Sequence, residues 1–423
     1  MSLLTLTSLS GLLSLLSTVA ADPFFVVQHG NAVVTSRRDP IISPGGISEH
    51  VHSIVGSSSF KSSYEYQNSV CGKCTSANVN VDKSNYWVPQ LYRKLGEGQL
   101  ELVKMNRVNT SGPTEQMYEF PKGMKMLAGN PFRNTFDAND PAQEAVEYVC
   151  LGTDDTPMNA FPERSCPDDL RAQVTFPNCW DGQNPWLEGS KHVSYPASGR
   201  FDAGGPCPST HPYRIPTLFF EYHFNDKYDY TPGARVWAQG DDIGYGFHGD
   251  FTMGWPEGLF TEIVNAGESC AVLFEVGKCP PLAQYFTGVG GGPCQPDDPS
   301  VVVNEEIGLT GPVAKLPGDN PIWNGGTAPN KSGSSGGSGS AATSANSAAG
   351  NNPVPGSGSS SAVGAAASSP AAAVAVPPTG SSTTPAPLAS SASTSVPTPG
   401  ATTSSKHGGW GGWGGKRRLG RSH

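Results

Sequence analysis

The sequence predicts a mostly β domain of the sandwich or jelly-roll class, with long disulfide-bridged loops and a disordered tail behind it. Helical periodicity is scarce between residues 22 and 324. The apolar runs there are short and end at Pro, Gly, Asn or Asp, which is typical of strands. A varied, aromatic segment of about three hundred residues can bury one large core or two small ones.

The first 21 residues predict a secretory signal peptide. They carry no charged side chain, contain the apolar run 12–16, and end in the small residues Val19, Ala20 and Ala21. This run is too short to span a bilayer, and no later segment is apolar enough. We therefore expect a secreted protein, extracellular or associated with the cell wall, with no membrane span.

Within residues 22–324, three apolar runs predict strands and two short stretches can form helices. The strand candidates are MLAGNPFRNTF (126–136), IPTLFFEYHF (215–224) and ESCAVLFEVGKCP (268–280). The first helix candidate begins at DPAQEAVEYVCLG, with Asp140 as N-cap and Pro141 at the first helical position. The second is the short stretch DDLRAQ (168–173).

Nine cysteines in a secreted chain predict disulfides. Nine is an odd number, so at most four bridges form within the chain and one thiol remains. The spacing Cys71-Gly-Lys-Cys74 is compatible with a redox motif or half a zinc site. Because no second CxxC follows, a structural bridge near a turn is the favoured interpretation.

The composition changes after residue 324. Residues 325–405 are almost entirely Ser, Ala, Gly, Thr and Pro, which predicts a disordered, O-glycosylated linker. Residues 406–423 form a basic Gly/Trp tail, whose Trp410 and Trp413 can stack on sugar rings or can simply be adhesive. N-glycosylation sequons begin at Asn109 and Asn330.

The charge distribution argues against a nucleic-acid partner. The whole chain carries −9, and the only charged residues after 330 are six lysines and arginines. Taking these six positive charges from the total leaves −15 for the part before them. An acidic body of this kind repels nucleic acids and suits a neutral polysaccharide or a cation.

Seven sequence blocks resemble a large fungal secreted family catalogued as a domain of unknown function, number nineteen ninety-six. The resemblance covers residues from about 38 to 260. The blocks, in the order typical of the family, are RDPIISPGGISEHVHSIVG, DKSNYWVPQLY, FPKGMKMLAGNP, TFPNCWDGQN, KHVSYP, CPSTHPYRIPTLFFEYHF and GDDIGYGFHGDFTMGW. The resemblance implies an extracellular or wall-associated protein and no settled activity. In the last block Asp242 stands where the family usually has Pro.

The sequence HVH predicts a pair of metal ligands, His50 and His52. On an extended chain, residues two apart face the same side, so both imidazoles would point together. A third ligand must come from elsewhere, and we take His211 for it. Other available ligands are His192, His223, His248, Glu221, Asp241 and Asp250. The expected cofactor is a divalent metal, with zinc, copper and iron all open. The alternative is a histidine pair that bonds loop carbonyls.

Carboxylates and histidines in two later blocks suggest acid–base catalysis. The candidate catalytic residues are Glu221, Asp241, His248, Asp250 and His192, with His50 as a further proton carrier. Glu221 and His223 share one face if their segment is a strand, where burial would tune their pKa values. Each has a plainer explanation: a solvent-facing strand for Glu221, and a calcium loop or a capped turn for Asp241 and Asp250.

Four aromatic residues are candidates for stacking on a sugar. They are Trp87, Tyr195, Trp237 and Trp255. Packing in a β core is the alternative.

Three functions remain open. The first is a hydrolase or lyase acting on cell-wall or plant polysaccharide. The second is a metal-binding extracellular protein without turnover. The third is a structural or adhesive wall component that works through its tail. We expect a polysaccharide or the cell wall as the partner, and no nucleic acid.

Overall fold

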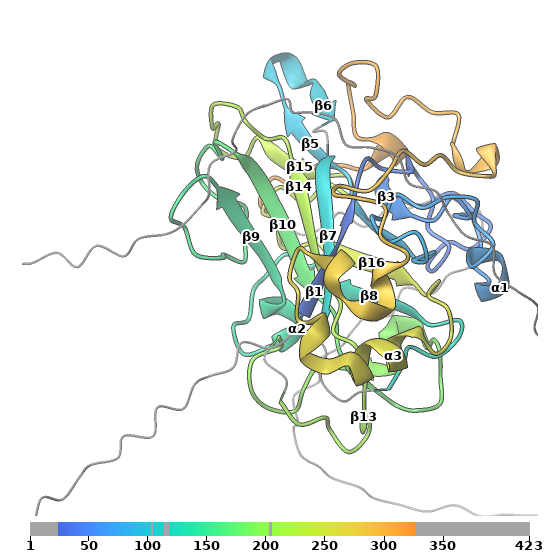
Figure 1. The fold of residues 1–423 in the computed structure, drawn as a ribbon. Helices are drawn as coiled ribbons and strands as arrows, with labels where there is room; N and C mark the ends of the chain where they lie inside the picture. The colour runs from blue at the N-terminus through green and yellow to red at the C-terminus, as the bar shows by residue number, and fades with distance from the viewer. Residues whose placement is uncertain (1–23, 103–104, 114–117, 203–204, 327–423) are drawn as a thin grey trace, which may run out of the picture. The chain divides into compact units, whose positions relative to one another are not determined.

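The computed structural model describes residues 24–102, 105–113, 118–202 and 205–326 (Figure 1). The predicted signal peptide, nearly all of the predicted linker with Asn330, and the basic tail lie outside these residues. Within them, no helix is long and apolar enough to cross a membrane.

Two five-stranded antiparallel sheets make up most of the fold, which confirms the mostly β prediction. The first sheet has the order β1-β7-β14-β10-β9. Its strands are β1 (Phe24–His29), β7 (Met105–Pro113), β14 (Phe219–Phe224), β10 (Asp169–Thr175) and β9 (Val146–Leu151). The second sheet has the order β2-β3-β4-β16-β8. Its strands are β2 (Val34–Ser36), β3 (His52–Gly56), β4 (Asn85–Pro89), β16 (His248–Thr252) and β8 (Lys125–Gly129).

Two small antiparallel sheets and several short helices complete the described part. One sheet joins β12 (Val193–Ser194), β11 (Cys179–Trp180) and β13 (Tyr213–Arg214), and the other joins β15 (Arg235–Trp237), β5 (Leu91–Lys94) and β6 (Leu100–Leu102). The α-helices are α1 (Tyr66–Ser69), α2 (Pro141–Glu144), α3 (Leu259–Ala266) and α4 (Pro280–Ala283). The 3-10 turns are η1 (Gly96–Gly98), η2 (Glu188–Ser190), η3 (Gly267–Cys270), η4 (Val276–Lys278), η5 (Pro299–Val301) and η6 (Pro317–Asp319).

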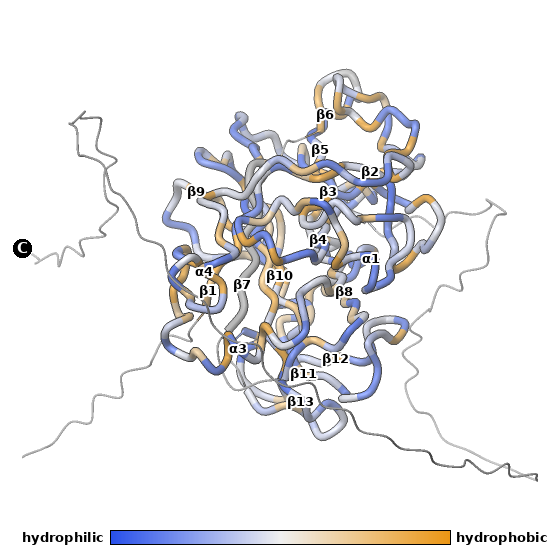
Figure 2. Tube along the Cα trace, turned by 45° about the vertical axis from the view of Figure 1, so that its right-hand side comes forward, coloured by the Kyte–Doolittle hydropathy of each residue, from blue (hydrophilic) through white to orange (hydrophobic). Residues whose placement is uncertain are grey.

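The two large sheets pack face to face, and the main hydrophobic core lies between them (Figure 2). The ring of Phe220 in β14 meets the ring of Tyr86 in β4, with centroids 5.5 Å apart. Gly249 in β16 lies directly against Phe220, so close that a methyl group there would sit 3.0 Å from its ring. Because side chains alternate along a strand, the neighbours of Gly249 point to the opposite, outer face of the second sheet.

That outer face is also buried. A second apolar cluster covers it, in which Ile54 and Trp87 of the sheet pack with Phe60 and Val301 from long loops. The Ser36 hydroxyl fixes one of these loops by donating to the carbonyl of Val301 at 2.7 Å. Long loops therefore enclose polar residues that would otherwise face water.

The helix predictions were correct at one position and wrong at another. Asp140 caps α2 as predicted, since its carboxylate accepts from the Ala142 N–H, but the helix ends at Glu144 and β9 follows. The stretch 168–173, expected as a helix, is instead largely β10. It lies between β14 and β9 and turns Leu170 and Ala172 into the core, so tertiary pairing outweighs its helical composition.

The strand predictions were likewise mixed. Residues 126–136 and 215–224 contribute β8 and β14. Residues 268–280 were wrongly expected to form a strand. A disulfide joins Cys270 to Cys279, and this short loop winds through the 3-10 turns η3 and η4.

Four disulfides form, and one cysteine stays free. The bridges are Cys74–Cys294, Cys150–Cys166, Cys179–Cys207 and Cys270–Cys279. The CxxC stretch does contribute a structural bridge, whose partner the spacing did not predict: Cys74 pairs with Cys294 across 220 residues, and Cys71 is the exposed free thiol. Disulfides of this number are typical of a protein that matures in an oxidising, extracellular environment.

Candidate metal centre

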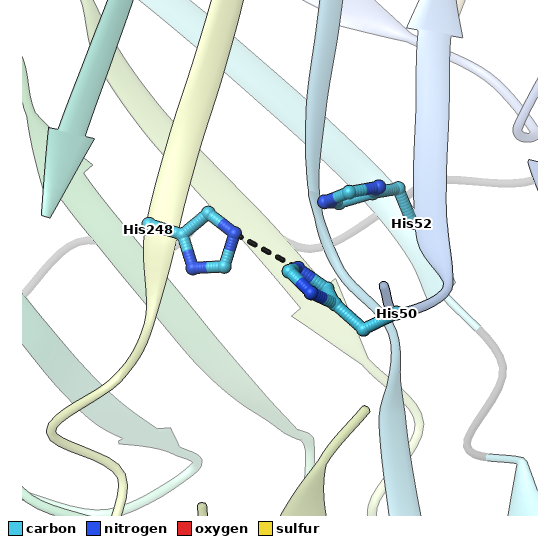
Figure 3. A group of neighbouring side chains, drawn as sticks. All are labelled: His50, His52 and His248. Carbon is cyan, nitrogen blue, oxygen red and sulfur yellow. Dashed lines mark hydrogen bonds between the residues drawn. The ribbon is translucent and has the colours of Figure 1, made fainter. Parts of the chain in front are cut away.

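Three histidines from distant parts of the chain meet on the outer face of the second sheet (Figure 3). His52 is the first residue of β3, His50 precedes it by two positions, and His248 is the first residue of β16. Nε2 of His50 lies 3.1 Å from Nε2 of His248, and the rings of His50 and His52 have centroids 4.3 Å apart. One nitrogen of each ring lies within 4.8 Å of the others, a separation that a bound metal ion can bridge.

The sheet itself brings these side chains together. Strands β3 and β16 both pair with β4, so they stand on either side of it. Alternation places His52 on the same face as Ile54, and His248 on the face opposite Gly249. The predicted shared orientation of His50 and His52 is therefore found, and the fold supplies the third imidazole from residue 248.

Two of the imidazoles are held in a defined tautomer. Nδ1 of His52 lies 3.1 Å from the carbonyl oxygen of Arg38, and Nδ1 of His248 lies 2.9 Å from that of Gly246. A carbonyl oxygen only accepts, so each Nδ1 carries the proton and each Nε2 keeps its lone pair. Nε2 of His52 is buried without a hydrogen-bond partner among the described residues. Metal-binding histidines are oriented by this kind of backbone bond.

Burial keeps the same two imidazoles neutral. It lowers the pKa of His52 to about 3. It also lowers the pKa of His248 to about 4, with a smaller contribution from the neighbouring His52. Both rings are therefore unprotonated at the pH of most extracellular fluids, which is the state that binds a metal.

A buried carboxylate stands next to the histidines. Asp250 is fully buried, and its Oδ2 lies 3.9 Å from Nε2 of His248. Neither of its oxygens has a hydrogen-bond partner among the described residues. Burial, and then the nearby Asp39, raise the pKa of the Asp250 carboxyl well above its ordinary value.

Asp39 is a second buried carboxylate at this site, and the sequence analysis did not single it out. Its Oδ1 accepts from the N–H groups of Ile41 and Ile42 at 2.8 and 3.0 Å. Burial raises its pKa, and these two hydrogen bonds and the charges of His248 and Lys125 oppose that rise. The local sequence identifies it only as a turn residue, since Asp commonly bonds the amides that follow it.

His211 and His192 lie outside the three-histidine group. His211 is half-buried, and its ring nitrogens lie 2.9 Å from the Lys191 carbonyl oxygen and 2.9 Å from the Thr210 hydroxyl. His192 is buried, and its Nε2 lies 2.8 Å from the carbonyl oxygen of Lys125. The third member of the group that can hold a metal is therefore His248, and His211 is not part of it.

Glu221 and His223 lie on the other side of the sandwich from the metal centre. They share a face of β14, as predicted, opposite Phe220 and Tyr222. The hydroxyl of Tyr222 reaches the second sheet and donates to the carbonyl of Tyr86 at 3.0 Å, so Glu221 points away from that sheet. There it forms an ion pair with Arg171, with 2.6 Å between Oε1 and Nη1.

Asp241 caps the glycine-rich loop before β16. Its carboxylate accepts from the backbone N–H groups of Ile243, Gly244 and Gly246 at 2.6–3.1 Å. Burial raises its pKa to about 6. Asp242, which stands where the resemblance leads us to expect Pro, forms an ion pair with Lys94 at 3.0 Å.

Three of the four aromatic candidates are packed inside the protein, and Tyr195 is half-buried. Trp87 and Trp237 are fully buried, and Trp255 exposes 2% of its surface. The Tyr195 hydroxyl donates to the carbonyl of Thr175 at 2.7 Å. Packing in the interior accounts for these rings as the structure has them.

A comparison with known families identifies one match. The model of the domain of unknown function DUF1996 matches residues 39–255 of the 423, a span that holds His50, His52 and His248. No curated protein and no solved structure matches the chain.

Proposed function

We propose that this chain, which belongs to the DUF1996 family, is an extracellular metal-binding protein whose centre is formed by His50, His52 and His248. One observation carries the proposal: the backbone holds the Nδ1 protons of His52 and His248, so both Nε2 atoms keep a lone pair within one buried cluster. The lone pair of His248 accepts a hydrogen bond from Nε2 of His50 at 3.1 Å, and Nε2 of His52 is buried without a hydrogen-bond partner among the described residues. A histidine that served only to pack would gain nothing from a buried nitrogen without a partner, because such an atom lowers stability.

The chemistry of the site favours a divalent transition metal. Imidazole nitrogens bind Zn²⁺, Cu²⁺, Fe²⁺ and Ni²⁺, and for a given set of nitrogen ligands Cu²⁺ and Zn²⁺ bind among the tightest. His50, the most exposed of the three, shows only 6% of its surface. Such an enclosed centre suits retention of an ion better than reaction with a large substrate.

A polysaccharide hydrolase or lyase has less support from the geometry. It needs an acid and a base around one bond, with carboxyl groups roughly 5 to 9.5 Å apart. The side chain of Glu221 points away from the second sheet and pairs with Arg171, and the carboxylate of Asp241 accepts hydrogen bonds from backbone N–H groups. A polysaccharide or cell-wall partner stays a prediction, to be tested by retention of the full chain on insoluble wall.

Metal binding can be tested with variants that preserve the local hydrogen bonds. Asn places its amide nitrogen near the position of Nδ1 and has nothing at Nε2. His52→Asn and His248→Asn should therefore keep the bonds to Arg38 and Gly246 and lose the metal ligand. We expect one Zn²⁺ or Cu²⁺ per wild-type chain by elemental analysis after dialysis, and an affinity at least about 100-fold lower in each variant.

His211→Asn is the matched control, because His211 lies outside the group. It should bind one ion like the wild type. Thermal unfolding gives an independent readout, because an ion at 100 times its Kd adds about 2.7 kcal/mol to the stability. The proposal fails if the wild-type chain binds no ion, or if both His→Asn variants bind as tightly as the control.

A further inference from the structure

Asp250 is a buried acid without a hydrogen-bond donor, and its charged form is costly there unless a cation lies beside it. It is fully buried on the same face of β16 as His248, and Trp87 lies directly opposite it on the neighbouring strand β4. Trp87 belongs to the apolar cluster over this face. A carboxylate in such surroundings needs a cation or hydrogen-bond donors nearby. Among the described residues, neither oxygen has a hydrogen-bond donor, and the basic group beside the carboxyl is the imidazole of His248.

Two other charged groups at the site, Asp39 and Lys125, have interactions of their own. Asp39 accepts two backbone N–H bonds and interacts with the charge of Lys125. Lys125 is half-buried, and its ammonium group lies 5.3 Å from the centre of the Trp186 ring. Asp250 is thus the buried acid of this cluster that stays without a donor of its own. Its Oδ2 is 3.9 Å from Nε2 of His248, the nitrogen that faces the ligand position.

We infer that Asp250 is the residue that makes this centre prefer a divalent ion over a monovalent one; the inference rests on the proposed metal site. Three neutral imidazoles offer lone pairs but no net charge, so by themselves they leave the whole charge of a bound Cu⁺ or Zn²⁺ ion uncompensated in a buried site. A buried carboxylate adds a Coulomb attraction that is proportional to the charge of the ion. The free energy that Asp250 contributes to a divalent ion is therefore about twice its contribution to a monovalent ion.

Replacing the charge while keeping the shape tests this inference. Asp250→Asn is nearly isosteric and neutral, and an amide is less costly to bury than a carboxylate, so we expect the metal-free variant to fold. Affinities for Zn²⁺, and for Cu⁺ held by a chelator under nitrogen, should be measured on the full chain. We expect the Zn²⁺ affinity to fall about 100-fold and the Cu⁺ affinity about tenfold. Doubling the lost binding free energy squares the factor by which the affinity falls, and 100 is the square of ten.

A second buried acid provides the control. Asp82 is fully buried and bonds the Tyr86 hydroxyl at 2.8 Å, outside the histidine group. Asp82→Asn should leave the ratio of the two affinities unchanged, and Asp250→Ser should repeat the shift if the Asn variant folds poorly. Equal losses for both ions, or no loss, in the Asp250 variants would overturn the inference while leaving the metal site intact. A wild-type chain that binds neither ion would overturn the proposed function and this inference together.

Discussion

Replacing Gly249 by Ala tests how closely the two large sheets must approach for the metal centre to form. Gly249 lies in β16 between His248 and Asp250, but it faces the core. An added Cβ would lie 2.8 Å from Cγ1 of Val174, 3.0 Å from the Phe220 ring and 3.1 Å from the Phe176 ring. All three neighbours are fully buried, so none can move aside into solvent.

The expected loss of stability follows from this crowding. Adding one methyl group to a well-packed core costs about 1–3 kcal/mol. The backbone of Gly249 does not have a positive φ, so Ala fits its conformation and recovers about 0.4–1 kcal/mol of chain entropy. We therefore expect a net loss of about 1–2 kcal/mol. The strain pushes β16 outward and displaces His248, so Zn²⁺ affinity should fall as well.

Urea unfolding of metal-free protein, followed by tryptophan fluorescence, measures the stability. Gly311→Ala is the matched control, because nothing lies within 4 Å of the position of its Cβ and its φ is not positive. The control should be as stable as the wild type or slightly more so. If Gly249→Ala unfolds at the same urea concentration as the control, the close packing of β16 against the first sheet is not what positions the histidine.

Two further predictions concern residues away from the centre. The wild-type chain should react with one equivalent of a thiol reagent without denaturant, because Cys71 is exposed and free. The Cys71→Ser variant should react with none, and its unfolding midpoint should stay unchanged. A loss of one bridge in this variant would contradict the pairing of Cys74 with Cys294. Burial lowers the pKa of His192 from 6.5 to about 4, so the unfolded chain takes up a proton there before the folded protein does as the pH falls. This group therefore removes up to about 3 kcal/mol of stability between pH 6.5 and pH 4. His192→Gln keeps a donor for the Lys125 carbonyl and should lose that much less stability over this range, and parallel pH profiles for the two proteins would refute the assignment.

Local patterns in the sequence predicted local features of the structure well. The apolar segment IPTLFFEYHF gave β14 with Glu221 and His223 on one face, because alternation is a property of the strand alone. Asp140 and Pro141 likewise predicted the start of α2. The stretch 168–173 shows the limit of this approach, because its pairing partners are set elsewhere in the chain.

The candidate site was predictable only in part, for the same reason. The spacing of His50 and His52 predicts that both side chains point the same way. His248 lies 198 residues from His50, and over that length spacing does not predict whether two side chains meet. The sequence offers His248 as an available ligand and as a catalytic candidate, but the predicted third ligand, His211, is wrong. The partner of Cys74 could not be predicted either, because the fold, and not proximity in sequence, brings Cys294 to it.

The enclosure of the three histidines bears on when an ion can arrive. The carbonyl groups of Arg38 and Gly246 accept hydrogen bonds from His52 and His248, and His50 bonds His248, so the cluster is built by segments that meet only after the sheet has assembled. An ion that reaches the folded chain would therefore have to wait until these segments open. Once trapped, it would join β3 to β16 as a removable crosslink, and its escape would be as slow as the opening of the loops above it.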